Sequence, residues 1–446
     1  MKRDICMMKS CLRLFLICIS VAVTTSPVYA QKTIAFTRVN IVSVENGEII
    51  AGQTVVISDG RIVAVGPTGG TATPQSATII DGAGQYLMPG LAEMHGHIPG
   101  NNSSWPAEDV LFLYVSQGIT TVRGMLGAEG QLELREKAAK GEIISPTLYL
   151  AAPALGGHNV ESPEDARAKV KQYAQEGWDL LKVHEGLSAE AYDAIAEAAN
   201  EVGLPFAGHV TDKVTLQHAL DKGQRTIEHM DNYLAFIGAE ETAVTIAQLQ
   251  QAVDITLKAG AGIVPTLALF EHYETSPDVL ASYGELRYAP QDVTDNWAKI
   301  SKQEYEQNAE NMQEIVLFLE NQRKLLNALS KDGVEILLGS DAPQVYSVPG
   351  FSLHREMASM ENAGMNRKDI LYSGTGAAGA YFASDDTFSV IAPGARADLV
   401  LLSANPLDDL ANTQLINGVM LNGRWITKSE IAERLEEIAE RYLKDE

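Results

Sequence analysis

The stretch P-G-L-A-E-M-H-G-H-I, residues 89–98, places two histidines, His95 and His97, inside an otherwise apolar run. Alternation along a β-strand aims both side chains at the same face. Burying two imidazoles is costly unless a partner satisfies them. The stretch therefore predicts a strand whose histidines serve a purpose other than packing.

Downstream of this strand, β-like runs alternate with helical segments. Ser162, followed by Glu164 and Asp165, is typical of a helix start, and Gly203 is typical of a helix end. Eight βα units in succession predict an α/β fold of the (β/α)8 TIM barrel type. The candidate strands are 91–98, 119–125, 147–152, 180–184, 205–210, 226–230, 262–269 and 334–340.

Both ends of the chain have a different character from the barrel region. Short β-runs follow residue 33, with Asp59-Gly60 as a hairpin turn, and similar runs return after residue 389. These patterns predict a small composite β-sandwich domain formed by residues 31–88 and 389–446. The hydrolase-type barrel, residues 89–388, would be inserted between its two halves.

Residues 1–30 have the pattern of a signal peptide, with a basic leader, a short apolar core and a small-residue cleavage site ending at Ala30. All three cysteines, Cys6, Cys11 and Cys18, fall inside it. We therefore expect an exported protein, periplasmic or secreted, without disulfides or a cysteine nucleophile. No later stretch is long and apolar enough to span a bilayer, so no membrane insertion is expected after cleavage.

The chain is strongly acidic, with a formal net charge of -24. Removing the leader, which has four basic residues and one acid, makes the charge still more negative. Such a chain should repel nucleic acid and anionic membranes. The expected partner is a small-molecule or dipeptide substrate, and because barrels of this size often associate, a homo-oligomer is an open possibility.

Polar side chains gather at the predicted C-terminal ends of the strands, where barrel enzymes keep their chemistry. Besides His95 and His97, these are Lys182, His209, His229 and Asp341. Imidazoles and a carboxylate that converge on one cavity are costly to bury without a cation, so the set predicts a metal site.

The motifs around these residues resemble the amidohydrolase superfamily, within it the branch similar to imidazolonepropionases and exported prolidase-like dipeptidases. The resemblance covers nearly the whole mature chain and is carried by "PGLAEMHGH", "GITTVRGM", "DLLKVHEGLS", "GLPFAGHV", "QRTIEHM", "GSDAP" and "PGARADLVLLSANPL". It implies two divalent metal ions, of which zinc is the expected one.

The resemblance also implies a role for each ligand. His95 and His97 would bind the more buried metal, and His209 and His229 the outer one. Asp341 would be both ligand and proton carrier. Lys182 would bridge the metals as N6-carboxylysine, which suits a lysine desolvated enough to be neutral. The alternative for Lys182 is a salt bridge to Glu185 or Glu228 at a single-metal site.

The sequence departs from the family pattern at Glu93, where an aspartate is usual, and at Gly124, where "VRD" would be usual. Glu93 keeps a carboxylate on the face of the ligands, whereas Gly124 removes one. Three weaker candidates for substrate binding are Arg123, for which a structural ion pair is an equal alternative, His158 and Tyr273. Tyr273 lies in the long polar stretch 271–312, which we interpret as a lid loop or a disordered loop.

These observations predict a metal-dependent hydrolase of C–N bonds, amide or peptide, in small substrates. A metal-activated hydroxide would attack, with Asp341 carrying the proton. The alternatives are a one-metal cyclic amidase or deaminase and an exported non-catalytic metal-binding or ligand-binding barrel.

Overall fold

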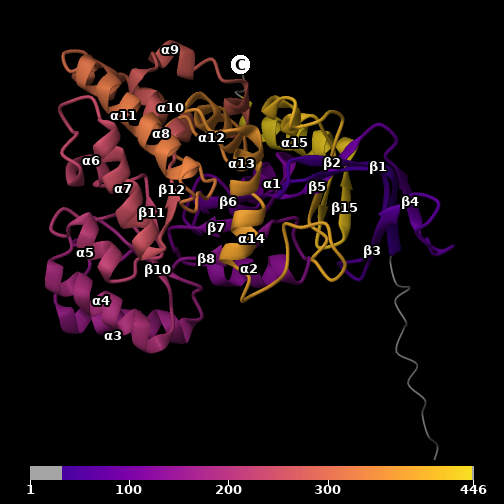
Figure 1. The fold of residues 1–446 in the computed structure, drawn as a ribbon, viewed down its shortest axis with the longest axis horizontal. Helices are drawn as coiled ribbons and strands as arrows, with labels where there is room; N and C mark the ends of the chain where they lie inside the picture. The colour runs from indigo at the N-terminus through magenta and orange to yellow at the C-terminus, as the bar shows by residue number, and fades with distance from the viewer. Residues whose placement is uncertain (1–32, 444–446) are drawn as a thin grey trace, which may run out of the picture.

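The computed structural model describes residues 33–443, so the predicted signal peptide lies outside the described residues. Figure 1 shows a large body of alternating strands and helices beside a smaller body made largely of strands. The smaller body contains β1–β3, from the start of the described chain, and β15, from near its end. Within residues 33–443, no helix combines the length and the apolarity needed to cross a bilayer.

Seven short strands form the inner wall of the large body. They pair in parallel as β6-β7-β8 and β9-β10-β11-β12. Their bounds are β6 Leu91–Gly96, β7 Ile119–Gly124, β8 Thr147–Leu150, β9 Leu181–Val183, β10 Phe206–Gly208, β11 Thr226–Glu228 and β12 Gly262–Val264.

Backbone contacts join the two groups of strands into a ring. A parallel bridge between Ala151 and Leu180 links β8 to β9, and one between Ile263 and Ile336 links β12 to segment 334–341. That segment returns to β6, because the Met94 N–H donates to the Leu338 carbonyl at 2.8 Å. Eight segments thus surround one core, and the predicted α/β class is confirmed.

Helices cover the outside of this ring, as βα alternation requires (Figure 1). Ser162 accepts the Asp165 N–H at the start of α3, and Gly203 ends α4 at φ +72°, so both predicted helix boundaries are confirmed. The first helices are α1 Ala107–Ser116, α2 Gln131–Ala139, α3 Pro163–Glu176, α4 Ala189–Val202, α5 Leu216–Asp221, α6 Tyr233–Phe236, α7 Ile246–Ala259 and α8 Leu267–Phe270. The later helices are α11 Met312–Lys331, α12 Phe351–Asn362, α13 Arg367–Ser373, α14 Gly376–Tyr381 and α15 Lys428–Tyr442.

The smaller body is one mixed sheet in the order β15-β14-β13-β5-β1-β2-β3, with β4 paired to β1. Both chain ends contribute, and within residues 33–443 the hydrogen bonds join these eight strands into one mixed sheet rather than the two sheets expected of a sandwich. Asp59 and Gly60 form the predicted hairpin turn, both at positive φ. The strands are β1 Thr33–Ser43, β2 Glu48–Ser58, β3 Arg61–Pro67, β4 Thr78–Asp81, β5 Tyr86–Pro89, β13 Leu399–Leu402, β14 Ile416–Leu421 and β15 Arg424–Thr427.

The stretch 271–312, expected to be a lid loop or a disordered loop, is mostly helical. Trp297 of its longest helix is buried, with its ring centroid 6.0 Å from that of Trp105 and 6.1 Å from that of Tyr346. These aromatic contacts anchor a polar helix that its own sequence pattern does not reveal. Its elements are η1 Glu271–Glu274, α9 Pro277–Leu280, η2 Gly284–Tyr288 and α10 Gln291–Asn308, and a further short helix, η3, spans Leu410–Gln414.

Candidate active site

Backbone hydrogen bonds between the end of β6 and the end of segment 334–341 bring three predicted ligands together. The Asp341 N–H donates to the His95 carbonyl at 2.7 Å, and the His97 N–H donates to the Ala342 carbonyl at 2.7 Å. These bonds place Asp341 Oδ1 2.6 Å from His97 Nε2 and 3.5 Å from His95 Nε2. The ligand atoms of His95, His97 and Asp341 all lie within 4.8 Å of one another, as a metal site requires.

Two further histidines continue this cluster across the mouth of the ring. His229 Nε2 lies 3.8 Å from Asp341 Oδ2, and the His229 ring centroid lies 4.8 Å from that of His95. The His209 ring stacks on His229 at the same centroid distance, 4.8 Å. The structure therefore brings all four predicted histidines and Asp341 together. However, the ligand atoms of His209, Glu185 and Asp231 lie within 4.8 Å of one another, so these residues form a second candidate group of metal ligands.

Three of the histidines are each held at Nδ1 by a neighbouring side chain. His95 Nδ1 is 2.7 Å from Glu228, His229 Nδ1 is 2.7 Å from Thr266 Oγ1, and His209 Nδ1 is 2.7 Å from Asp231. Partners of this kind orient metal-binding imidazoles and leave Nε2 for the ion.

Sequence reasoning did not identify the orienting roles of these three partners. Glu228 and Asp231 flank His229 in "EHMD", which is a usable signal for residues of this kind. Thr266 carried no signal, because its contact depends on how the turn after β12 is folded.

The surroundings shift the pKa values of His95, His229 and Asp341. Burial lowers the pKa of His95 to about 4 and that of His229 to about 3, so both imidazoles are neutral near pH 7. Burial alone would raise the pKa of Asp341, but His95 and His97 outweigh it and hold that pKa well below the usual range. Neutral imidazoles beside a carboxylate form a donor set that suits a divalent cation.

Lys182 lies inside the same cavity, with its Nζ 3.2 Å from His95 Nε2. Burial lowers its pKa, while Asp341 and Glu228 act in the opposite direction. Within the described chain, no carboxylate lies within ion-pair distance of this ammonium, so the alternative of a salt bridge to Glu185 or Glu228 is not what the structure has. The site therefore holds a desolvated lysine beside predicted ligands.

Arg123 does not lie where a substrate could reach it. Its side chain is fully buried, with its guanidinium 2.9 Å from Glu228 and 3.0 Å from Thr226 Oγ1. Glu228 in turn binds His95. The structure therefore has the structural ion pair that was the alternative to a contact with a substrate carboxylate. Arg123 supports the carboxylate that orients His95.

The two departures from the family pattern have separate structural consequences. Glu93 is buried and accepts the N–H groups of His95 at 3.0 Å and Ser340 at 2.8 Å, so it connects the strands that carry the first ligands. Burial raises its pKa to about 8. At Gly124, a Cβ atom would come within 3.0 Å of Leu150, so the residue is packed rather than open to substrate.

Backbone strain concentrates at the same site. His229, Thr266 and Asp341 adopt φ values of +61°, +48° and +60°. The left-handed region is uncommon for non-glycine residues and especially unfavourable for a β-branched threonine. Such strain persists only where the surroundings impose it and is typical of functional sites.

A cavity of about 240 Å³ adjoins His229 and is lined in part by Phe270, Phe318 and Gln322. The Tyr273 ring centroid lies 6.4 Å from that of Phe270, which in turn lies 5.9 Å from that of His229. Tyr273 therefore packs against Phe270, which lines this cavity, and is not itself one of the lining residues. His158 is exposed in the loop after β8.

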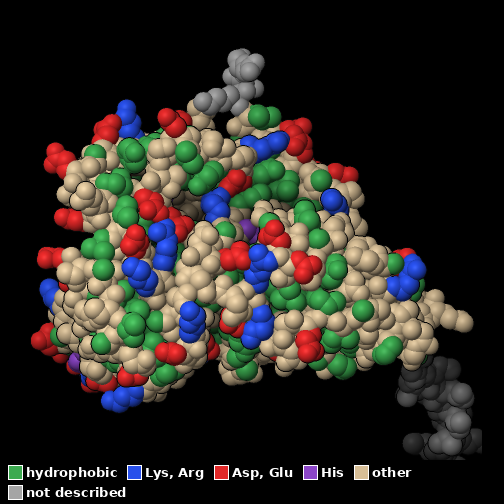
Figure 2. Space-filling model, turned by 45° about the horizontal axis from the view of Figure 1, so that its top comes forward, with side chains coloured by type: hydrophobic (Ala, Val, Ile, Leu, Met, Phe, Trp, Pro, Cys, Tyr) green, Lys and Arg blue, Asp and Glu red, His purple; other side chains and the backbone are tan. Residues whose placement is uncertain are grey.

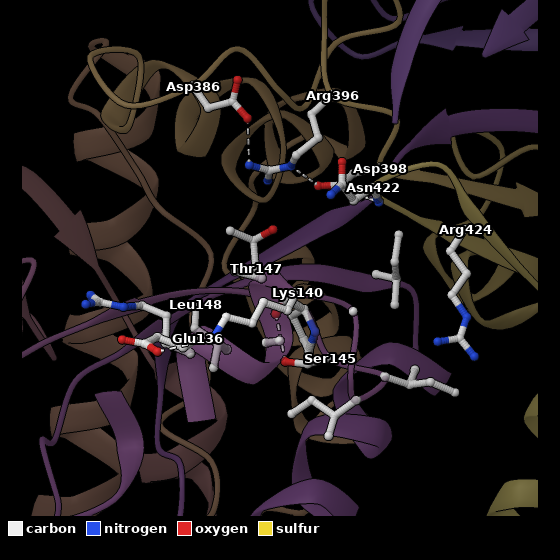
Figure 3. A pocket seen from close by; sticks show the side chains of 18 of the residues that line it. Glu136, Lys140, Ser145, Thr147, Leu148, Asp386, Arg396, Asp398, Asn422 and Arg424 are labelled. Atoms are coloured by element: carbon white, nitrogen blue, oxygen red, sulfur yellow. Dashed lines mark hydrogen bonds and ion pairs between the residues drawn. The ribbon is translucent and has the colours of Figure 1, made fainter. Parts of the chain in front are cut away.

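A roomier cavity, of about 550 Å³, lies away from the histidines, between the ring and the mixed sheet (Figure 3). Its buried charge is already paired, since Arg396 binds both Asp386 and Asp398. Volume therefore does not locate the chemistry here. In Figure 2, a histidine is visible beside a recess surrounded by acidic, basic and apolar side chains.

Residues 86–426 match the Amidohydrolase family, and because this match covers most of the chain, the protein belongs to that family. Within the described residues, His95, His97 and Asp341 form its candidate metal site.

The curated relatives of this chain include several adenine deaminases. The chain is 42% identical to adenine deaminase 3 of Rhizobium meliloti (strain 1021) over 182 residues, 38% of this chain and 30% of that protein. It spans less than a third of the length of the curated adenine deaminases it matches.

Solved structures share the fold over most of the chain. Bottromycin amidohydrolase has a TM-score of 0.73 at 21% identity, over 91% of this chain and 90% of that one. A Xaa-Pro dipeptidase with bound methionine has a TM-score of 0.67 at 17% identity, over 89% and 100%.

Proposed function

We propose that this protein hydrolyses C–N bonds, amide or peptide, in small substrates. The observation that carries the proposal is the convergence of His95, His97 and His229 on one carboxylate, Asp341, at the mouth of the ring. The names of the relatives support the same bond class, because adenine deaminases and Xaa-Pro dipeptidases both act on a carbon–nitrogen bond.

His95, His97, His209, His229 and Asp341 would hold the divalent ions, for which we propose zinc. When bound, such ions polarise a carbonyl and lower the pKa of water. Asp341 Oδ2, on the side facing His229, accepts the proton of the attacking water and passes it to the leaving nitrogen. Glu228, Thr266 and Asp231 keep the imidazoles oriented during this transfer.

We also propose that the neutral Lys182 amine adds carbon dioxide and releases a proton to form N6-carboxylysine, whose carboxylate would serve as a ligand for two ions. The desolvated amine, 3.2 Å from His95 Nε2, is supporting evidence, because carboxylation replaces a cation that two metals would repel with an anion that they attract. The competing candidate is a one-metal cyclic amidase or deaminase with an unmodified lysine. The name of the adenine deaminase relative supports the deaminase reaction.

We also propose the localisation and the substrate class that the sequence predicts. These are export to the periplasm or beyond, with cleavage after Ala30, and a small-molecule or dipeptide substrate. Neither nucleic acid nor a membrane is proposed as a partner, and association into a homo-oligomer is left to measurement.

A product analysis distinguishes the two candidate reactions. Purified protein would be incubated with dipeptides, N-acyl amino acids, lactams, cyclic ureas and adenine, and free amino acids and ammonia would be quantified. We expect amino acids from dipeptides or N-acyl amino acids and no ammonia from adenine. His97→Asn should abolish this release, whereas His218→Asn, at a partly buried pair with Asp193, should not.

Release of ammonia from adenine alone would favour the deaminase. No turnover on any of these substrates would contradict the proposal.

A further inference from the structure

The turn after β12 holds the residue that orients His229. Thr266 is fully buried, and its Oγ1 lies 2.7 Å from His229 Nδ1. Its φ of +48° is unfavourable for a β-branched side chain. Some neighbouring contact must therefore impose this conformation.

Glu356 of α12 supplies that contact. Its carboxylate is fully buried, and its two oxygens accept the N–H groups of the residues that follow Thr266, Leu267 at 2.9 Å and Ala268 at 2.7 Å. A carboxylate that binds two successive N–H groups fixes the path of the backbone that carries them. The chain immediately after Thr266 is thus held by a helix remote in sequence.

We propose that Glu356 and Thr266 are positioning residues for His229, acting as a relay from α12 through the turn after β12 to the imidazole. The Thr266 hydroxyl accepts the Nδ1–H, so that Nε2 keeps its lone pair on the side facing Asp341, 3.8 Å from its Oδ2. This inference rests on the proposed metal-binding role of His229.

The test compares two substitutions of Thr266. Thr266→Val keeps the shape but removes the hydroxyl, whereas Thr266→Ser keeps the hydroxyl. Zn²⁺ affinity would be measured by competition with a chromophoric chelator, and the absorption of the Co²⁺-loaded protein would report ligand geometry. Loss of an orienting partner typically weakens metal binding by about 10-fold to 100-fold. We expect Thr266→Val to show this loss and an altered Co²⁺ spectrum, and Thr266→Ser to restore both.

Two more variants separate positioning from general stability. Glu356→Gln should weaken Zn²⁺ binding in the same direction, because its amide group offers a donor to one of the two N–H groups. Thr256→Val is the matched control, since Thr256 is equally buried and hydrogen-bonded to Tyr233 but contacts no predicted ligand. It should lower thermal stability without changing Zn²⁺ affinity.

The outcomes are distinct. A wild-type protein that binds no Zn²⁺ overturns the proposed function and this inference with it. If the wild-type protein binds Zn²⁺, two results overturn the inference alone. One is a Thr266→Val variant with the Zn²⁺ affinity of the wild type. The other is an equal loss of Zn²⁺ affinity in Thr266→Val and Thr266→Ser. If Glu356→Gln fails to fold, the Thr266 pair still decides.

Discussion

Asp341→Asn should leave the protein folded and reduce turnover of its best dipeptide or N-acyl substrate by about 100-fold to 10,000-fold, the usual contribution of general acid–base catalysis. Asparagine tolerates the positive φ of residue 341 nearly as well as aspartate. Its amide oxygen can still accept a hydrogen bond, and the backbone bond to His95 is untouched. What it cannot do is carry the proton from the water to the leaving nitrogen.

The matched control for this substitution is Asp179→Asn. Asp179 is a partly exposed carboxylate paired with Arg135 and contacts no predicted ligand. It should keep turnover near the wild-type value, while circular dichroism shows both variants folded. Near-normal turnover of Asp341→Asn would assign the proton transfer to another residue.

Arg123→Met should destabilise the protein by about 3–5 kcal/mol, the usual cost of breaking a buried ion pair from one side. Burial alone would raise the pKa of Glu228, and it is Arg123 and His95 that hold that pKa below its usual range. Without Arg123, the Glu228 carboxylate stays buried beside His95 with its strongest partner gone. Urea unfolding followed by fluorescence measures the loss.

The stability of Arg123→Met is compared with that of a control variant and that of a double variant. Arg135→Met removes a partly exposed partner of Asp179 and should cost no more than about 1 kcal/mol. The double variant Arg123→Met with Glu228→Gln should recover part of the loss, because no unpaired charge remains. Equal costs for Arg123→Met and Arg135→Met would mean that the buried pair does not stabilise the fold.

The ligand cluster was predictable because the residues of a short stretch are enough to indicate which way the side chains of a strand point and where the strand ends. His95 and His97 needed only a period of two, and Asp341 needed only its place after an apolar run. Charge partners were not predictable in the same way. Whether Arg123 meets a substrate or Glu228 depends on the register of strands far apart in sequence.

The long segment shows a second limit of sequence reasoning. Helix α10 is polar along most of its length, and its stability comes from packing of Trp297 against Trp105 and Tyr346, which other loops provide. The single mixed sheet is a third case. Alternating patterns identified its strands, but the number of sheets depends on which edges pair.

If the histidines and Asp341 form a metal centre, the purified protein should contain divalent ions. Inductively coupled plasma mass spectrometry measures this metal content, with Lys182→Ala measured in parallel. We expect about two divalent ions per wild-type chain, the binuclear arrangement of metal-assisted hydrolysis, and about one or none in Lys182→Ala. A wild-type chain that hydrolyses its substrate at full rate while holding no stoichiometric metal would mean that these residues do not form a metal centre.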